Sequence, residues 1–154
     1  SSTLQMRTVT IELWINKRAD TEYGVYVAKN FEFGGGAGSG WFQLVNSHHN
    51  GRLEFRITSD GAPALTSNAT LAVNTWYYVV ATYDGTVAKL FVNGKLDGTL
   101  KVTATPKQTA DPLFIGRRMD GLFNDAAMDE VAIYSVALSA ERIAAHWRAA
   151  SKTP

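Results

Sequence analysis

The sequence lacks cysteine altogether: none occurs among its 154 residues. Disulfide cross-links and zinc sites with thiolate ligands are therefore excluded. A chain of this length buries enough apolar surface to fold without such cross-links. The absence is compatible with a protein secreted by a bacterium and equally with a cytosolic protein, so it leaves the compartment open.

Long apolar runs and an excess of one charge are also missing. No segment is apolar over the roughly 20 residues that a membrane-spanning helix needs, and no signal peptide opens the chain. Fifteen basic and 14 acidic residues give a formal net charge of +1. This balance provides no electrostatic attraction to nucleic acid or to an anionic membrane. Because the chain begins with serine instead of methionine, we expect it to be excised from a longer polypeptide.

Apolar and polar residues alternate along most of the chain, with turn residues between the runs. Over residues 9–16, apolar Val9, Ile11, Leu13 and Ile15 occupy every second position, which predicts a strand with one buried face. The same reasoning predicts strands at residues 23–29, 41–45, 52–58, 71–83, 87–92, 95–102, 113–116 and 128–136. Loops are predicted at residues 31–40, where five of ten residues are glycine, and at the polar stretch 59–68.

Two local signals fix a hairpin and a helix. Asn93-Gly94 predicts a tight type I′ turn, because both of its central positions need positive φ. Near the end of the chain, Ser139 is a good N-cap with Glu141 in the first turn. The apolar residues that follow helical spacing are Leu138, Ile143, Ala144 and Trp147.

Many short strands followed by one helix predict an all-β fold. The architecture that we expect is a two-sheet antiparallel β-sandwich, or jelly roll, with one short C-terminal helix. A closed barrel with a lid helix is the alternative. Because no internal repeat and no change of composition divides the chain, residues 1–154 are predicted to form a single domain.

Three segments carry a family resemblance. They are TVTIELWINKR (residues 8–18), NTWYYVVATYDGTVAKLFVNGKLDGT (residues 74–99) and MDEVAIYSVALSAERI (residues 128–143). In this order they resemble the laminin-G-like, concanavalin A-like jelly-roll domains, of the single-domain bacterial and pentraxin-like type. The resemblance implies two antiparallel sheets of about a dozen strands. These segments also have a plain structural interpretation, in which Trp76, Tyr78, Leu90 and Val92 lie mostly in the core.

The resemblance further implies a possible calcium site. Similar domains begin with another strand and an "FDG" loop that often supplies an acidic calcium ligand, and this sequence starts after that point. The remaining oxygen ligands that it suggests are Asp125 and Asp129, with Asp120 and Asn124 nearby. The alternative for Asp129 is a structural role, as a turn cap or as a partner of Arg117. A metal held by His48 and His49 is a weaker alternative.

The same superfamily includes glucanases, but the catalytic pattern is missing. Retaining glycosidases need two carboxyl groups about 5 Å apart, which a strand supplies from alternate positions on one face. No E-x-D-x-x-E run occurs. Asp129 and Glu130 are neighbours, so a regular strand would point them to opposite faces. The sequence therefore predicts a protein without catalytic residues.

Aromatic residues are abundant, at 11% of the chain. A sugar offers an apolar face ringed by hydroxyl groups, so a sugar site needs an exposed aromatic ring beside planar polar groups. The outer face that carries Glu12 and Trp14 is one candidate surface. We also predict ligand contacts at Trp41, which is flanked by the glycine-rich loop, and at Tyr23 and Tyr26 on the preceding strand. A second polar and aromatic loop adds Arg117, Arg118, Asp120, Phe123 and Asn124.

These observations favour a non-catalytic carbohydrate-binding module, secreted or at the cell surface of a bacterium. Its partners would be a polysaccharide and neighbouring domains of the same polypeptide, such as a glycan-active enzyme or an adhesin. Three alternatives stay open: a protein-binding adhesion domain, a structural spacer and a glycoside hydrolase.

Overall fold

The computed structural model describes residues 7–29, 41–48, 50–57, 63–102, 112–118 and 121–151. Within these ranges, ten strands form two antiparallel five-stranded sheets, and one helix follows the last strand. The prediction of an all-β sandwich with a short helix near the C-terminus is confirmed. About a dozen strands were expected from the resemblance, and the described residues contain ten.

Sheet A contains the longest strands. In spatial order they are β10 (Ala126–Tyr134), β1 (Val9–Lys17), β6 (Trp76–Tyr83), β7 (Val87–Val92) and β8 (Lys95–Lys101). The alternation in β1 places Ile11 and Leu13 in the core and leaves Glu12 and Trp14 on the outer face. The strand predicted from residue 71 begins only at Trp76, because the preceding residues include a turn in which Asn74 has a φ of 57°.

Sheet B lies on the other side of the core. Its strands, in spatial order, are β5 (Leu65–Thr66), β4 (Leu53–Ile57), β3 (Phe42–Asn46), β2 (Val25–Lys29) and β9 (Leu113–Ile115). Strand β5 corrects the prediction of a continuous loop over residues 59–68. Its two residues pair with Phe55 and Glu54 at the edge of the sheet, and a strand this short leaves no periodic signal in the sequence.

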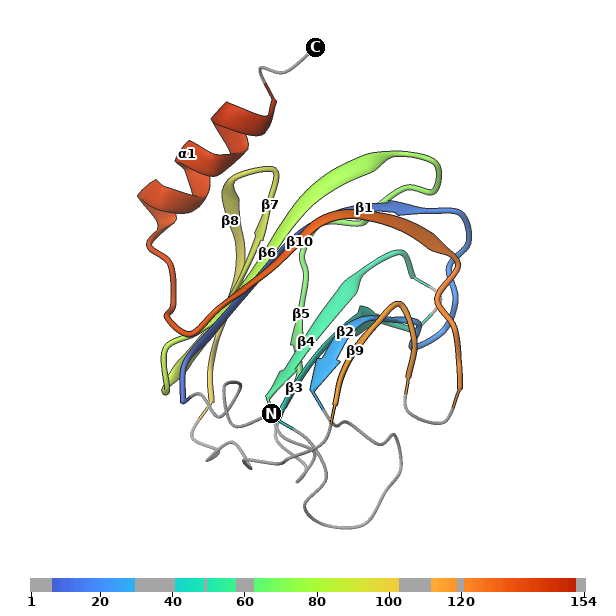
Figure 1. Cartoon of the computed structure of the whole chain (residues 1–154), viewed down its shortest axis with the longest axis horizontal. Coiled ribbons are helices and arrows are strands. Elements are labelled where there is room, and N and C mark those ends of the chain that lie inside the picture. Colours follow the sequence, from blue (N-terminus) through green and yellow to red (C-terminus); the bar gives the residue numbers. More distant parts are fainter. Residues whose placement is uncertain are drawn as a thin grey trace.

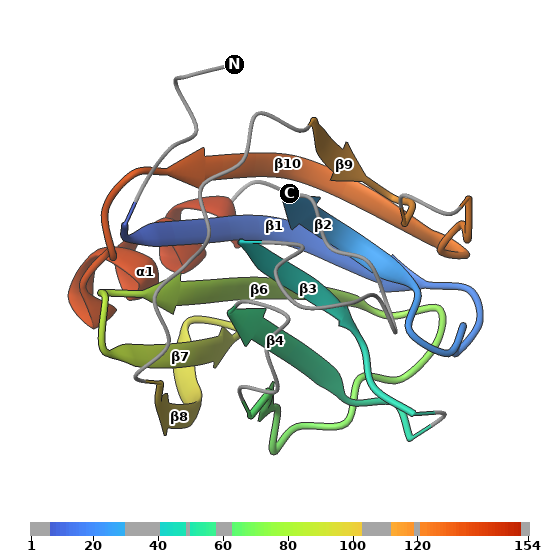
Figure 2. The ribbon, with the colours of Figure 1, turned by 90° about the horizontal axis from the view of Figure 1, so that it is seen from below.

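The apolar core fills the space between the two sheets. In Figure 1, sheet A arches over sheet B, and Figure 2 shows the strands of sheet B crossing in front of those of sheet A. The fully buried residues that meet there come from both sheets and include Ile11, Leu13, Tyr26, Trp41, Phe42, Leu44, Val79, Tyr83 and Leu90. The sandwich therefore has one main core between its two sheets.

The outer face of sheet A carries the helix α1 (Ala140–Ala150), which Figure 1 shows on the side away from sheet B. Ser139 caps it by accepting a hydrogen bond from the Arg142 backbone N–H at 3.3 Å, as predicted. Ile143 is buried against Tyr78, Val80 and Phe91 of the sheet. No described helix has the length and apolar character needed to cross a membrane.

The hairpin between β7 and β8 fixes where the helix docks. Asn93 and Gly94 have φ values of 50° and 75°, as the predicted type I′ turn requires. A Cβ atom on Gly94 would lie 2.7 Å from the Trp147 side chain. Glycine is therefore needed here both for the backbone conformation and for the close approach of the helix.

Candidate functional site

A β-bulge shapes the outer face of sheet A beside the helix. Glu12 of β1 pairs with Ala132 of β10, whereas Trp14 pairs with Asp129, so β10 has one extra residue between these two pairs. Glu130 lies in this bulge with a φ of 48°. A bulge turns a side chain away from the direction that regular alternation would give it.

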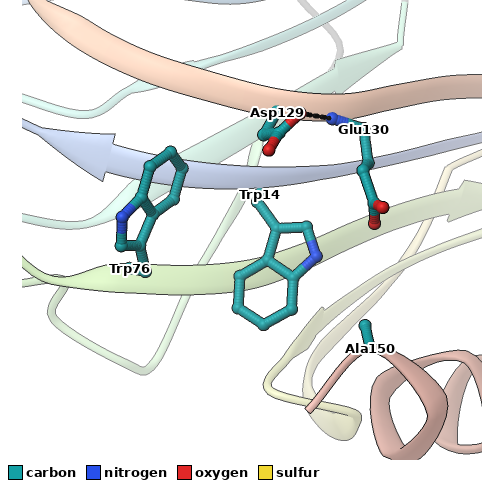
Figure 3. Close-up of a pocket in the computed structure, with 5 residues that line it drawn as sticks. All are labelled: Trp14, Trp76, Asp129, Glu130 and Ala150. Atoms are coloured by element: carbon teal, nitrogen blue, oxygen red, sulfur yellow. Dashed lines mark hydrogen bonds between the residues drawn. The ribbon is translucent and has the colours of Figure 1, made fainter. Parts of the chain in front are cut away.

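As a result, Asp129 and Glu130 line the same pocket. This corrects the expectation that they point to opposite faces, which holds only for a regular strand. The pocket has a volume of about 230 Å³ and is lined by Trp14, Trp76, Asp129, Glu130 and Ala150. Figure 3 shows Trp14 in the centre, between Trp76 and Glu130, with Asp129 above it and Ala150 at the end of α1 below. We call this pocket the tryptophan groove.

Trp76 is the most accessible aromatic ring of the groove. It is 46% exposed, which corrects the expectation that it belongs to the core. It is the first residue of β6, where it pairs with Asn16, and it lies on the same outer face as Trp14. The Trp14 ring is held by Tyr78 and Trp147, with centroid distances of 5.6 and 5.4 Å. One ring of the groove is therefore packed and the other is free to contact a ligand.

A cluster of polar groups lies beneath the helix, on the same outer face of sheet A as the tryptophan groove. The Glu12 carboxylate accepts a hydrogen bond from the Tyr78 hydroxyl at 2.8 Å and lies 3.1 Å from Nδ1 of His146. Burial raises the pKa of the Tyr78 hydroxyl, and the hydrogen bond to Glu12 raises it further. Burial and the charge of Glu12 also raise the pKa of Tyr134. Both phenols therefore stay protonated as donors, and they help to join β1, β6, β10 and the helix.

Two of the predicted ligand-binding residues lie in the core instead. Trp41 is 0% exposed, and its ring packs edge-on against Phe42 and Tyr83, with centroid distances of 5.0 and 6.3 Å. Tyr26 is also fully buried, and its hydroxyl donates to Asn46 at 2.7 Å. Neither ring can stack on a ligand in this structure, so the predictions for both are corrected.

Among the other predicted residues, those that the structure describes lie at one rim of the sandwich. Arg117 and Phe123 form an isolated bridge, and Asn124 accepts a hydrogen bond from Asn46 at 3.4 Å. Phe123 is 67% exposed. The Tyr23 hydroxyl forms a hydrogen bond with His48, and the Arg117 guanidinium lies 4.9 Å from the Phe114 ring centroid. The backbone N–H of Arg118 donates to the carbonyl of Leu122. Asp120 lies outside the described residues. A ligand site at this rim stays a prediction.

The predicted calcium ligands do not form a metal site by themselves. Asp125 and Asp129 are four residues apart along extended backbone, a separation of about 13 Å. Among the described residues, no three histidine or acidic side chains are close enough to hold a metal ion. His48 pairs with Glu22 at 2.5 Å, and His49 lies outside the described residues. Calcium binding therefore stays a prediction, and Asp120, expected near these ligands, lies outside the described residues.

Calcium has a direct test by thermal unfolding. A ligand that binds only the folded chain at 100 times its Kd contributes about 2.7 kcal/mol, which corresponds to roughly 5–10 °C for a chain of this size. We expect excess calcium chloride to raise Tm, EDTA to reverse the change, and Asp129→Asn to abolish it. Equal Tm values of the unsubstituted chain in calcium and in EDTA would contradict the prediction.

Comparisons with known proteins agree with this architecture. A candidate carbohydrate-binding protein from Bacteroides ovatus has a TM-score of 0.75 and 20% identity, over 94% of this chain and 42% of that one. The heptameric SAP-like pentraxin of Limulus polyphemus has a TM-score of 0.66 and 14% identity, over 90% of this chain and 69% of that one. The botulinum neurotoxin serotype D binding domain has a TM-score of 0.66 and 20% identity, over 93% of this chain and 36% of that one.

At these identities the likeness shows a shared fold, and this chain spans less than half of the first and third proteins. No curated protein sequence matches the chain. The family described as the concanavalin A-like lectin/glucanases superfamily matches residues 1–144, in agreement with the two antiparallel sheets. The chain therefore belongs to the concanavalin A-like lectin/glucanases superfamily.

Proposed function

We propose that the chain is a non-catalytic carbohydrate-binding module and that the tryptophan groove is its sugar site. The observation that carries the proposal is a defined pocket lined by the half-exposed Trp76 ring and by two carboxylates. An indole face suits the C–H face of a sugar ring, and carboxylate oxygens accept hydrogen bonds from sugar hydroxyls. The groove thus combines both kinds of contact that a sugar needs.

The same geometry argues against hydrolysis of the bound glycan. Glycosidases place two carboxyl groups on either side of the scissile bond, and one of them is buried enough to stay protonated as the acid. Asp129 and Glu130 are both exposed, so neither has the burial that keeps a general acid protonated. Both carboxylates can accept hydrogen bonds from a bound glycan. Binding is therefore the role that the groove supports.

We further propose that the chain works outside the cell as part of a longer polypeptide. The candidate carbohydrate-binding protein from Bacteroides ovatus is more than twice as long, since this chain covers 42% of it. A binding module linked to a glycan-active enzyme or an adhesin keeps its partner domain near the polysaccharide. This raises the effective concentration of the partner domain without any new contact.

Trp76→Ala tests the location of the site. We expect this variant to bind a recognised oligosaccharide about tenfold more weakly, because a central aromatic contact contributes about 1.4 kcal/mol or more. A glycan array would first identify the oligosaccharide, and isothermal titration calorimetry would then give Kd for each variant. Tm should change little, since nearly half of the side chain is already in solvent.

Two matched variants make this result decisive. Val136→Ala shortens another exposed apolar side chain outside the groove, so it should leave Kd unchanged. Phe123→Ala tests the rim. A loss of affinity in Phe123→Ala with none in Trp76→Ala would move the site to the rim.

Failure to bind any plant, algal or bacterial glycan, with capture of a protein partner instead, would favour the adhesion alternative.

A further inference from the structure

We infer that the tryptophan groove selects glycans that carry protonated amino groups over neutral and anionic glycans. The inference rests on the proposed function, because it names the class of sugar that the groove would bind. Its basis is the charge at the groove. The whole chain is close to neutral, with a net charge of +1, whereas both ionisable residues that line the groove are acidic.

The two carboxylates have no positively charged partner among the residues that the structure describes. The Asp129 carboxylate accepts a hydrogen bond from the backbone N–H of Glu130 at 2.8 Å. Neither Asp129 nor Glu130 takes part in an ion pair within the described ranges. A bound ammonium group would therefore gain attraction without first displacing a lysine or arginine.

The C-terminal end of the helix lies at the same place. Ala150, the last residue of α1, lines the groove. The C-terminal end of a helix carries a partial negative charge of about half an elementary charge, which favours a cation nearby. In α1 the side chain of Arg148, in the last turn, offsets part of this charge. The bulge on β10 and the end of α1 come from separate elements, so their effects on a cation are independent.

The aromatic walls favour the same ligand. A cation within about 6 Å of an indole ring centroid is attracted by the ring, and tryptophan is the best of the aromatic side chains for this contact. Trp14 and Trp76 both line the groove beside the acidic pair. A uronic acid or a sulfated sugar would instead place its negative charge against Asp129 and Glu130, which costs free energy.

The size of the groove limits how much of the glycan enters it. Its volume of about 230 Å³ is below the roughly 300–1,000 Å³ of pockets that hold drug-sized ligands. We therefore expect the groove to hold one amino sugar unit, with the rest of the chain outside. The free amino sugar units of a partly deacetylated polysaccharide, which also contains acetylated units, fit this description.

Calorimetry with four tetrasaccharides of similar length tests the inference. The ligands are a glucosamine tetramer, its N-acetylated form, a glucose tetramer and a uronic acid tetramer, at a pH at which the amines are protonated. We expect the glucosamine tetramer to bind about tenfold more tightly than the two neutral forms, a size typical of one or two ion contacts. The uronic acid tetramer should bind most weakly. Raising the salt concentration should reduce only the preference for amines.

The double variant D129N/E130Q removes both charges while keeping the shape of the side chains. It should bind the glucosamine and glucose tetramers equally well. Glu141→Gln is the matched control, because it removes a carboxylate from the first turn of α1, at the other end of the helix from the groove. This control should keep the preference for amines.

The outcomes separate the inference from the proposed function. Equal affinity of the unsubstituted chain for amino and neutral tetramers would overturn the inference and leave the binding function standing. A preference for amines that survives in D129N/E130Q would also overturn it, since another site would then supply the charge. If none of these ligands bound but other glycans did, the inference alone would fail. If no glycan of any kind bound, the proposed function would fail with it.

Discussion

Replacing Trp41 with alanine is expected to lower the free energy of unfolding by about 3–5 kcal/mol, the range for a large aromatic residue removed from a core. Trp41 has no exposed surface and packs edge-on against Phe42 and Tyr83. Alanine would leave a cavity that these rings can fill only in part. The glycan affinity of the molecules that remain folded should be unchanged, because Trp41 is not part of the groove.

Urea unfolding followed by tryptophan fluorescence, together with calorimetric titration at low temperature, would measure both quantities. Trp76→Ala is the matched substitution, since it removes the same side chain from the surface. The two variants should behave in opposite ways, one losing stability and the other losing affinity. A Trp41→Ala variant with normal stability and weakened binding would show that this ring contacts the ligand after all.

Replacing Asp20 with asparagine is the second substitution with a large expected effect, about 3 kcal/mol of lost stability. The Lys17 ammonium is almost completely buried at the end of β1, and it bonds the Asp20 carboxylate at 2.6 Å. Its other contact is the Gly51 backbone carbonyl at 3.3 Å. Asparagine would leave a buried charge without its counter-ion. This loss of stability is at the lower end of the roughly 3–5 kcal/mol expected for breaking a buried ion pair, because the Asp20 side chain is partly exposed.

Lys17→Met provides the control for this prediction. Methionine has a similar length and no charge, so it removes the need for a counter-ion, and Asp20 can be hydrated because it reaches solvent. We expect this variant to lose less than about 1.5 kcal/mol. Urea unfolding of both variants at neutral pH would compare them. A larger loss in Lys17→Met than in Asp20→Asn would show that the pair contributes through packing instead of charge.

Most of the fold could be predicted because local patterns match the structure. The alternation in residues 9–16, the Asn93-Gly94 turn and the Ser139 cap each specify a conformation over a few residues. The errors in the fold occur where the pattern is too short or is interrupted. Strand β5 has only two residues, and the positive φ of Asn74 ends the alternation before β6.

The candidate site was harder to predict, and the two tryptophans show why. Trp76 was expected in the core and is half exposed, whereas Trp41 was expected at the surface and is buried. The alternation of β6 does contain a usable signal. Trp76 is in phase with Tyr78 and out of phase with Val79 of the main core. That phase places Trp76 on the outer face, beside Trp14, but it does not show that α1 stops short of covering it.

The shared orientation of Asp129 and Glu130 could not be predicted from the sequence. Adjacent side chains on a regular strand point to opposite faces of the sheet. No residue type in this segment indicates that a bulge adds an extra residue. The bulge becomes visible only when β10 is paired with β1. The groove therefore depends on the register between two strands that are more than 100 residues apart in the chain.

The sequence by itself determined the all-β sandwich, most of its strands, the tight hairpin and the capped helix, because these depend on contacts between near neighbours and on which face of each strand is apolar. The tertiary structure alone decided where α1 lies on sheet A, which tryptophan reaches solvent, and that two neighbouring carboxylates share one groove. The physical reason is that these features arise from packing and strand register between distant segments, and no local pattern records either of them.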